Sequence, residues 1–419
     1  MTRRSFAVVG SGIAGLTAAH VLQTRGDVTL FEADDRLGGH ADTHDVPTSD
    51  GRIIGVDTGF IVHNKKTYPT LLRLFDELDV ATQESDMSMS VSCAGCGIEY
   101  AGGRGMSGLL PSARAVTNWR YLRMLTEVKR FHRQASEVLA GSDDALTLAQ
   151  FLVRGGFSDY FNSHFMTPLV AAVWSTAPTQ AGDYPARYLF AFLQNHGMLT
   201  VTGAPTWYTV IGGSARYVER VAKGLTSIQT SCAVRSVERV GAGVELRDAD
   251  DVTYRFDGVV VATHPNQALG MLAKPTGSER DLLAAISYTR NPTLLHTDTS
   301  VLPVAARAQA SWNYAMPSCD ARPTAVQLSY NMNRLQRLDA DATYVVTLNG
   351  EARVDQHSIL ARMEYEHPVY TTESVAARAK LPELNDGVIA FAGAYHGWGF
   401  HEDGAKSGLD AAASLGVRW

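Results

Sequence analysis

The sequence predicts an α/β protein whose parallel sheet is assembled from the beginning, the middle and the end of the chain. Three short apolar runs support this prediction, at residues 6–9, 259–262 and 388–392. Each run has the length and the continuous apolar content typical of a strand that is buried on both faces. The first run is followed by a helical pattern and a second strand, so these segments form one βαβ unit.

The elements between these runs can be justified in order. Apolar residues at helical spacing predict a helix over residues 11–26, and a strand over 28–31 ends at Glu32. Alternating patterns around a Gly-Ala-Gly turn predict an antiparallel group of strands at 234–240, 244–246 and 253–256. The run at 388–392 leads into a glycine-rich turn and an Ala-rich closing helix.

We expect two domains, each made of segments that are separated in the sequence. The domain with the parallel sheet comprises residues 1–64, 211–265 and 385–419. The second domain has mixed α and β content, comprises residues 65–210 and 266–384, and includes a long helix at about 117–139. It contains most of the tryptophans, among them Trp119, Trp174, Trp207 and Trp312.

Composition excludes several classes of protein. Hydrophobic residues make up 45% and charged residues 19% of the 419 positions, which indicates a folded chain with a large core. The net charge of −6 argues against a nucleic-acid binder, so we expect no nucleic-acid partner. The sequence has no apolar run of about 18 residues and therefore no predicted spanning helix. With only four cysteines, a reducing, cytoplasmic location is expected.

A glycine-rich loop joins the first strand to the first helix and predicts a dinucleotide site. Its sequence is Gly10-Ser11-Gly12-Ile13-Ala14-Gly15. The first glycine permits the tight turn, the second lets a diphosphate approach the backbone, and the third lets the helix pack on the strand. The helix N-terminus favours the phosphates, and Glu32 can accept hydrogen bonds from a ribose. A second match at residues 103–108 has no leading apolar strand, and Pro111 follows it, so we expect a flexible loop there.

The segment after Glu32 distinguishes between nicotinamide and flavin dinucleotides. It reads Ala33-Asp34-Asp35-Arg36-Leu37-Gly38-Gly39-His40. A nicotinamide domain needs no second glycine pair with a neighbouring basic residue. A flavin with its ribityl chain does, because the backbone must again pass close to the cofactor. The predicted cofactor is therefore FAD, and it is expected to be non-covalent because no attachment signature accompanies these motifs.

These motifs resemble the superfamily of flavin amine oxidases, phytoene desaturases and protoporphyrinogen oxidases. The resemblance implies a Rossmann-type FAD-binding domain interleaved with a mixed α+β substrate domain. In this superfamily an Arg stands at the position of His40, so any charge that His40 gives to the diphosphate is pH-dependent. Ala394 stands where many members carry an acid that holds the ribityl chain.

The resemblance also implies further cofactor contacts. Thr58, Gly59 and Phe60 correspond to a segment whose backbone passes the isoalloxazine ring, and Val234 corresponds to an adenine contact. Gly393, His401 and Glu402 fall in the motif that closes over the flavin, where the last helix directs its N-terminus at the ring and stabilises negative charge on it. Including these positions, the predicted cofactor-binding residues are Gly10, Ser11, Gly12, Ile13, Ala14, Gly15, Glu32, Ala33, Arg36, Gly38, Gly39, His40, Thr58, Gly59, Phe60, Val234, Gly393, His401 and Glu402.

Within the superfamily, the chain resembles one bacterial branch of FAD-binding oxidoreductases. This branch is often encoded beside cyclopropane-fatty-acid synthase-like methyltransferases. The resemblance implies a hydrophobic or lipid substrate and a methyltransferase as a partner. The segments that carry it are residues 57–69, 207–217, 296–298, 312–314 and 399–404.

The sequence leaves the reaction open. Phe60, Tyr395, His396 and Trp398 are candidates for the pocket beside the ring, or they simply cover its edge. No acid–base pair can be chosen. The leading hypothesis is hydride transfer on a fatty acyl or lipid chain. The alternatives are an oxygen-using amine oxidase, a redox-neutral double-bond isomerase, and a non-catalytic flavoprotein that assists a lipid methyltransferase.

Two further features each have a functional and a purely structural explanation. Cys93 and Cys96 form a CxxC, which suits a redox pair or half a zinc site, but Cys232 and Cys319 stand apart in the sequence. We therefore expect no metal and reduced, inert surface cysteines. Basic residues crowd the predicted long helix, which is typical of a solvated face or of a helix that lies on anionic lipid at the inner face of the membrane.

Overall fold

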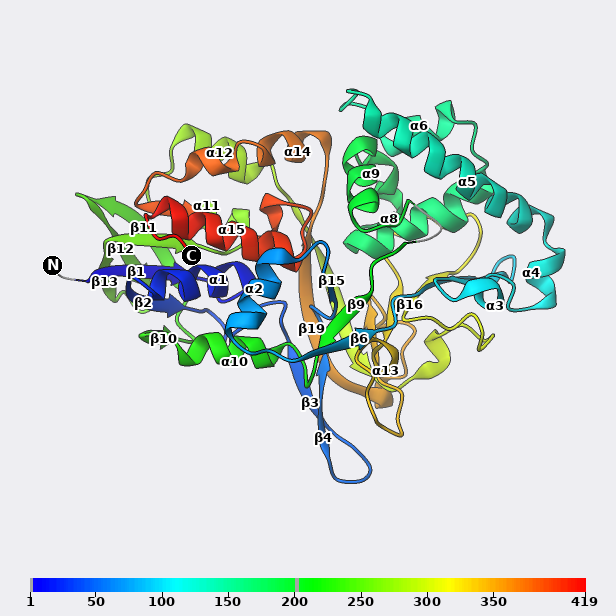
Figure 1. Ribbon diagram of the computed structural model, residues 1–419, viewed down its shortest axis with the longest axis horizontal. Coiled ribbons are helices and arrows are strands. Elements are labelled where there is room, and N and C mark those ends of the chain that lie inside the picture. Colours follow the sequence, from blue (N-terminus) through cyan, green and yellow to red (C-terminus); the bar gives the residue numbers. More distant parts are fainter. Residues whose placement is uncertain (1–2, 200–202) are drawn as a thin grey trace.

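The computed structural model describes residues 3–199 and 203–419 and contains a five-stranded parallel sheet with helices on both sides (Figure 1). Its strand order is β10-β2-β1-β14-β20, so β1 lies between β2 and β14. The strands are β1 Arg4–Val9, β2 Gly26–Phe31, β10 Ser227–Gln229, β14 Gly258–Val261 and β20 Ile389–Phe391. The predicted assembly from three distant segments is confirmed, although the short edge strand β10 was not predicted.

Two helices that are far apart in the sequence pack together against this sheet. Helix α1 spans Ile13–Gln23 and helix α15 spans His401–Ser414. The first helix is shorter than predicted at both ends. Gly12 is its N-cap in an extended conformation, and β2 already begins at Gly26.

An antiparallel group of three strands flanks the parallel sheet. It comprises β11 Val234–Val240, β12 Gly243–Asp248 and β13 Thr253–Phe256, as the sequence predicted. Phe31 from the parallel sheet packs edge-on against Tyr254 and Phe256 of this group. The two sheets therefore share one core.

The second half of the molecule is built on a seven-stranded mixed sheet. Its order is β19-β15-β18-β17-β16-β7-β8, and all neighbours are antiparallel except β16 and β7. The strands are β7 Met89–Cys93, β8 Glu99–Gly102, β15 Tyr288–His296, β16 Trp312–Met316, β17 Leu328–Asn331, β18 Val345–Leu348 and β19 Ile359–Pro368. The long strands β15 and β19 run between the two halves of the molecule (Figure 1).

A layer of helices covers this half at the end away from the parallel sheet (Figure 1). The long helix α5 spans Trp119–Ala140, close to the predicted 117–139. Its inward face buries Tyr121, Met124 and Phe131 among other aromatic side chains. The other helices of the layer are α6 Leu148–Arg154, α7 Asp159–Phe161, η1 Asn162–Met166, α8 Thr167–Trp174 and α9 Ala186–Asn195.

The remaining elements lie outside the sheets and the helical layer described above. Among them, β3 and β4 form a projecting hairpin, and β5, β9 and β6 form a small sheet. Their bounds are β3 Thr43–Pro47, β4 Ile53–Asp57, β5 His63–Asn64, α2 Pro69–Glu77, β6 Thr82–Ser85, α3 Gly105–Leu109, α4 Ala113–Thr117, β9 Trp207–Val210, α10 Ala215–Lys223, α11 Pro265–Met271, α12 Gly277–Ala284, α13 Met332–Leu335 and α14 Thr372–Arg378.

The second glycine motif, at residues 103–108, is not the flexible loop that was predicted. Strand β8 leads directly into it and the short helix α3 begins at Gly105. However, β8 is an antiparallel edge strand and α3 has only five residues. The motif therefore lacks the βαβ setting of a dinucleotide site.

Across the described parts of the chain, the structure shows no helix with both the length and the apolar content needed to cross a bilayer.

Candidate functional site

The glycine loop at the carboxyl end of β1 has the geometry that its sequence predicts. Gly10 adopts φ +97°, and its N–H donates to Phe31 O at 2.8 Å. A Cβ on Gly15 would lie 1.9 Å from Gly10 O, so only glycine allows α1 to pack this closely. A Cβ on Gly12 would meet nothing within 4 Å. The backbone at the start of α1 is therefore open to a ligand.

Glu32 connects this loop to the second glycine pair. Its Oε2 accepts hydrogen bonds from the Ser11 N–H at 2.8 Å and the Ser11 hydroxyl at 2.5 Å, and the Ser11 Oγ accepts from the Gly38 N–H at 3.0 Å. The other oxygen, Oε1, accepts from the Asp34 N–H. The carboxylate thus holds the glycine loop and the Gly38 turn together, and its contact with a ribose stays a prediction.

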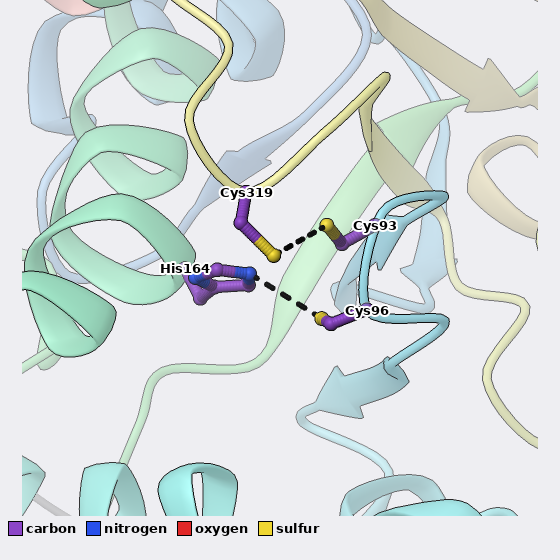
Figure 2. Close-up of side chains that lie close together, drawn as sticks. All are labelled: Cys93, Cys96, His164 and Cys319. Carbon is purple, nitrogen blue, oxygen red and sulfur yellow. Dashed lines mark hydrogen bonds between the residues drawn. The ribbon is translucent and has the colours of Figure 1, made fainter.

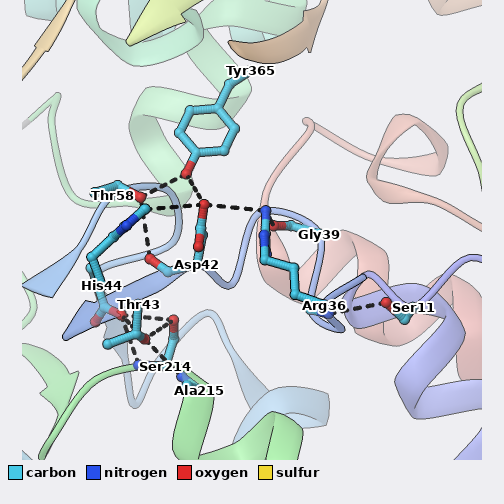
Figure 3. Close-up of polar contacts among 12 residues, drawn as sticks. Ser11, Arg36, Gly39, Asp42, Thr43, His44, Thr58, Ser214, Ala215 and Tyr365 are labelled. Atoms are coloured by element: carbon cyan, nitrogen blue, oxygen red, sulfur yellow. Dashed lines mark hydrogen bonds and ion pairs between the residues drawn. The ribbon is translucent and has the colours of Figure 1, made fainter. Parts of the chain in front are cut away.

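Arg36, Asp42, Thr58 and Tyr365 form a polar chain beside this turn (Figure 3). Arg36 donates to Gly39 O at 2.9 Å and pairs with Asp42 Oδ2 at 3.1 Å. The Tyr365 hydroxyl donates to the same Asp42 oxygen at 2.7 Å and lies 2.6 Å from Thr58 Oγ1. Although burial acts to raise the pKa of Asp42, hydrogen bonds from His44 and Tyr365 and the charge of Arg36 hold it below its usual range.

His40 lies next to this chain, within a group of histidines. Its ring is 5.5 Å from that of His367 and 6.4 Å from that of His264, measured between centroids. Removal from water, together with the charges of His264 and Arg36, lowers the pKa of His40 to about 4. His40 is therefore neutral at pH 7 in the ligand-free protein, unlike the Arg of related sequences.

Residues 57–60 pass close to the second glycine turn. A Cβ on Gly59 would lie 2.2 Å from His40 O, and the Phe60 N–H donates to that oxygen at 2.6 Å. Asp57 is 1% exposed, and its Oδ1 accepts from the hydroxyl of Thr43 and from both the N–H and the hydroxyl of Ser214. Burial raises the pKa of Asp57 to about 6. Its role is to fix this backbone segment.

Helix α15 directs its N-terminus toward the same region. The His401 ring stacks on Phe60 with 3.6 Å between centroids, and its Nε2 lies 3.0 Å from the Tyr217 hydroxyl. A Cβ on Gly404 would lie 2.7 Å from Ile13 Cγ2, and one on Gly408 would lie 2.1 Å from Ala14 O. These two glycines let α15 pack directly on α1. The N–H groups at the starts of both helices, which have no acceptor within their own helix, are thereby presented to one site.

The side chain of Glu402 binds the protein and not the predicted cofactor site. Its two carboxylate oxygens accept from the N–H groups of Thr70 and Leu71, each at 2.9 Å, at the start of α2. The carboxylate therefore caps α2, which leaves the Glu402 backbone N–H as the group available to a flavin.

The four pocket candidates do not share one location. Phe60 packs on His401. Tyr395 is 1% exposed and packs in the core between the parallel sheet and its flanking strands. Trp398 instead packs against the core of the second half of the molecule. His396 lies between them in the short helix η6 Ala394–His396, where burial lowers its pKa to about 4.

The buried polar atoms of these segments fit a long ligand with polar ends. Within the residues that the structure describes, five of them lack a hydrogen-bond partner: Arg36 Nη1, His40 Nε2, Tyr395 Oη, His396 Nε2 and Trp398 Nε1. A buried polar atom is normally satisfied, so this run of unpaired atoms favours a ligand that follows the segments. The open backbone at Gly12 and the two helix N-termini suit a diphosphate and a flavin ring, so these residues fit FAD.

The remaining predicted positions lie at the other end of this region. Ala33 is exposed directly after β2. Val234 opens β11, and the loop before it is fixed to the same segment because Cys232 N–H donates to Glu32 O and Ser231 N–H donates to Asp34 O, each at 2.8 Å. Their predicted contacts with the adenosine half stay predictions.

Sequence reasoning missed the polar partners that come from distant segments. Asp42, Tyr365, Ser214 and Gln336 support the predicted positions, and Gln336 donates to Asp57 Oδ2 at 2.9 Å. Only Asp42 had a signal in the sequence, because it is an acidic residue two positions after His40 and close to the basic Arg36. Tyr365 and Gln336 come from the other half of the molecule, and no local pattern connects them to the site.

Comparison with known proteins supports the same conclusion. Putrescine oxidase bound to putrescine has a similar structure, with a TM-score of 0.71, 16% identity and 98% of each chain covered. Cyclohexylamine oxidase from Brevibacterium oxydans IH-35A has a TM-score of 0.69 and 18% identity, with 99% of this chain and 98% of that chain covered. A CLA-producing fatty acid isomerase from P. acnes has a TM-score of 0.66 and 15% identity, with 97% of each chain covered.

These similar structures establish the fold. It is the predicted architecture of two domains whose segments are interleaved along the sequence. The family described as flavin-containing amine oxidoreductase matches residues 13–295, which is more than half of the chain. The protein therefore belongs to the flavin-containing amine oxidoreductase family, and its cofactor is FAD.

Proposed function

We propose that this FAD-dependent oxidoreductase transfers hydride from a hydrophobic substrate, such as a fatty acyl or lipid chain. The observation that carries the proposal is an aromatic cluster where residues 396–400 meet helix α9. Phe400 stacks on Phe192 with 4.9 Å between centroids, and Trp398 lies 6.1 Å from Phe192 and 6.3 Å from Tyr188. Phe192 and Tyr188 are buried and Trp398 and Phe400 are half-buried, and an environment of this kind suits an alkyl chain better than a polar metabolite.

The acidic residues of this segment offer no counter-charge to an amine. Glu402 caps α2 through both of its oxygens. Asp403 accepts from the Phe400 N–H at 2.9 Å and packs under Gly397, and removal from water raises its pKa to about 7. Both carboxyl groups are therefore engaged with the protein, and a substrate cation would rely on aromatic faces alone.

The chain's own residues hold the cofactor and exclude water. The glycine loop and Arg36 would hold the diphosphate, and Gly59 and the N-terminus of α15 would lie along the ring. When bound, FAD supplies the hydride acceptor. We propose that it is held without a covalent bond, since Cys93, Cys96 and Cys319 lie on or beside strands β7 and β16 of the seven-stranded sheet and Cys232 lies 3.6 Å from Asp248 at the flanking sheet.

Anaerobic reduction of the flavin tests this proposal. Oxidised and reduced flavin differ near ~450 nm, so fatty acids, acyl lipids and simple amines can be compared by the rate of bleaching. We expect reduction by acyl substrates and an increase in KM for Trp398→Ala. The control is Val153→Ala, because Val153 is 82% exposed on α6 and lies outside both the flavin site and the proposed membrane contact. Rapid reduction by amines without reduction by lipids contradicts the proposal.

The likeness to amine oxidases and to a fatty acid isomerase keeps two other reactions in the test. An amine oxidase would release peroxide in air from an amine. An isomerase would change the position of a double bond without changing the product mass. If no candidate substrate reduces the flavin or changes, the protein is better described as a non-catalytic partner of a lipid methyltransferase.

We further propose that a lipid substrate is reached by peripheral contact with an anionic membrane at the inner face. Apolar residues recur at helical spacing along α5, at Leu122, Leu125, Val128 and Phe131. Most of this face is not free for the role, because Phe131 is fully buried and Leu125 and Val128 pack on the core, whereas Leu122 is exposed. The start of α5 and the segment before it suit the role better. Met106, Val116 and Trp119 are exposed there, next to Arg120 and Arg123.

Co-sedimentation with vesicles measures this contact. We expect more binding to anionic than to neutral vesicles, and a loss of binding for Trp119→Ser. Equal recovery with both kinds of vesicle excludes the membrane contact.

A further inference from the structure

We propose that Cys93, Cys96, His164 and Cys319 bind one Zn²⁺ ion in a structural site (Figure 2). The metal-binding atoms of these four side chains all lie within 4.8 Å of one another. The sequence predicted no metal and separate surface cysteines. The prediction of separate surface cysteines is wrong, since Cys93 is 2% exposed and Cys319 Sγ lies 3.7 Å from Cys93 Sγ.

Two of the separations between these atoms match those of a tetrahedral zinc site. With Zn–S of about 2.3 Å and Zn–N of about 2.0 Å, tetrahedral angles place two sulfurs about 3.8 Å apart and a sulfur and a nitrogen about 3.5 Å apart. The Cys93–Cys319 distance is 3.7 Å, and Cys96 Sγ lies 3.6 Å from His164 Nε2. A disulfide would need about 2.05 Å between sulfurs, and all four cysteines of the chain are free.

The hairpin between β7 and β8 is shaped to present two sulfurs to one point. The Gly97 N–H donates to Cys93 O at 2.8 Å, and Gly97 adopts φ +66°, which favours glycine. Backbone N–H groups also face the sulfurs, that of Cys96 toward Cys93 and that of Ile98 toward Cys96. The hairpin thus directs backbone donors as well as both side chains to the point where the ion would lie, and thiolate is the form of cysteine that binds zinc.

Gly95 brings the third sulfur to this hairpin. A Cβ at Gly95 would lie 3.0 Å from the backbone N of Cys319, so glycine allows the loop between β16 and β17 to lie close against it. The Ala94 N–H donates to Met316 O at 2.9 Å and fixes the same approach. Gly95 and Gly97 therefore allow the Cys93–Cys96 hairpin and the Cys319 loop to lie close together.

His164 is held in the orientation that a ligand needs. Its Nδ1 lies 2.8 Å from Ser163 Oγ, which leaves Nε2 directed at Cys96. Its ring stacks on Tyr160 with 3.8 Å between centroids, and Tyr100 OH donates to its backbone oxygen at 2.6 Å. Partners of this kind fix the tautomer and orientation of zinc-bound histidines.

Three cysteines and one histidine complete a tetrahedral shell, so such a site leaves no position for a substrate or a reactive water. Binding forms three Zn–S bonds and one Zn–N bond, and the thiol protons pass to solvent. No oxidant or reductant is required. The ion would join the β7–β8 hairpin, the helical layer through η1 and the β16–β17 loop, and its role would be to fix that layer on the seven-stranded sheet.

Metal analysis of the full chain tests the site. The protein is expressed in zinc-containing medium, desalted, and analysed by plasma mass spectrometry for zinc per chain. We expect about one zinc in the wild type, and at least a tenfold lower content in Cys96→Ser and His164→Ala. Cys232→Ser is the matched control, because Cys232 lies outside the cluster, and it should keep its zinc.

A second measurement does not depend on the folding of variants. The wild-type chain is stripped with a chelator under reducing conditions and titrated with Co²⁺. Intense sulfur-to-cobalt charge-transfer bands and tetrahedral visible bands are expected, and Zn²⁺ should displace them. The proposal is overturned by a reduced wild-type chain that takes up neither ion in stoichiometric amount, by equal loss of zinc in Cys232→Ser, or by a mapped Cys93–Cys319 disulfide in the purified protein.

Discussion

Replacing Gly408 with Ala tests whether close packing of α15 on α1 holds the FAD site together. The new Cβ would lie 2.1 Å from Ala14 O and 3.1 Å from the Ala18 N, and both are backbone atoms that cannot move aside by a rotamer change. The two helices would have to separate by roughly 1 Å to restore normal contact. Overpacking of this kind costs about 1–3 kcal/mol in the free energy of unfolding. FAD affinity should fall as well, because the N-termini of both helices would shift.

The assay is thermal unfolding of the apo and FAD-loaded protein, with FAD affinity measured by fluorescence quenching. We expect the variant's midpoint to fall by about 1–3 °C. Gly270→Ala is the control, because Gly270 lies in helix α11 and a Cβ there would meet nothing within 4 Å. That change should stabilise by about 0.5–1 kcal/mol through helix propensity. If Gly408→Ala behaves like Gly270→Ala, the packing argument is wrong.

Three further changes test separate parts of the site. Gly12→Val should lower the unfolding midpoint only slightly, because its Cβ meets nothing within 4 Å and the loss is that of a poorer N-cap residue. It should weaken FAD binding at least about tenfold in the same fluorescence titration, and unchanged affinity would place the diphosphate elsewhere. Because the pKa of His40 is about 4 without ligand and a bound diphosphate would raise it, binding takes up a proton. FAD affinity should therefore fall as the pH rises from about 4 and level off above the bound-state pKa. His40→Arg should remove this dependence, and an identical pH profile for both proteins would exclude His40 as its source. Asp57→Ala removes the acceptor of four hydrogen bonds and should lower the free energy of unfolding by about 2–4 kcal/mol in a denaturant titration. An unchanged free energy of unfolding would show that this buried network does not stabilise the fold.

Local patterns predicted the parts of the fold that local physics determines. The βαβ unit, the three-strand antiparallel group and the long helix α5 each follow from apolar periodicity and glycine punctuation within one segment. The edge strand β10 has only three residues and was missed, because its identity comes from pairing with β2. The seven-stranded sheet was not predicted in detail, since its strands pair across long intervals that no short window contains.

The site divides in the same way. The roles of Gly10, Gly12 and Gly15 could be predicted because each depends on backbone geometry within one turn. The partners of Asp42 and Cys319 could not, because each contact joins residues more than 200 positions apart. A sequence taken alone gives the spacing along the chain, and the proximity of Cys319 to a CxxC is a product of the β16–β7 pairing.

The polar contacts between the two halves of the molecule suggest why their segments are interleaved. Asp57 binds Gln336, and Asp42 binds Tyr365, so the segment beside the flavin is fixed by residues of the other half. Both acids lie in buried surroundings, where a charge left without its partners is costly. The backbone from Asp42 to Phe60 can therefore hold its position only when both halves are folded. Binding of FAD should accordingly report on the integrity of the substrate half, and damage to that half should lower FAD affinity even where no residue touching the cofactor has changed.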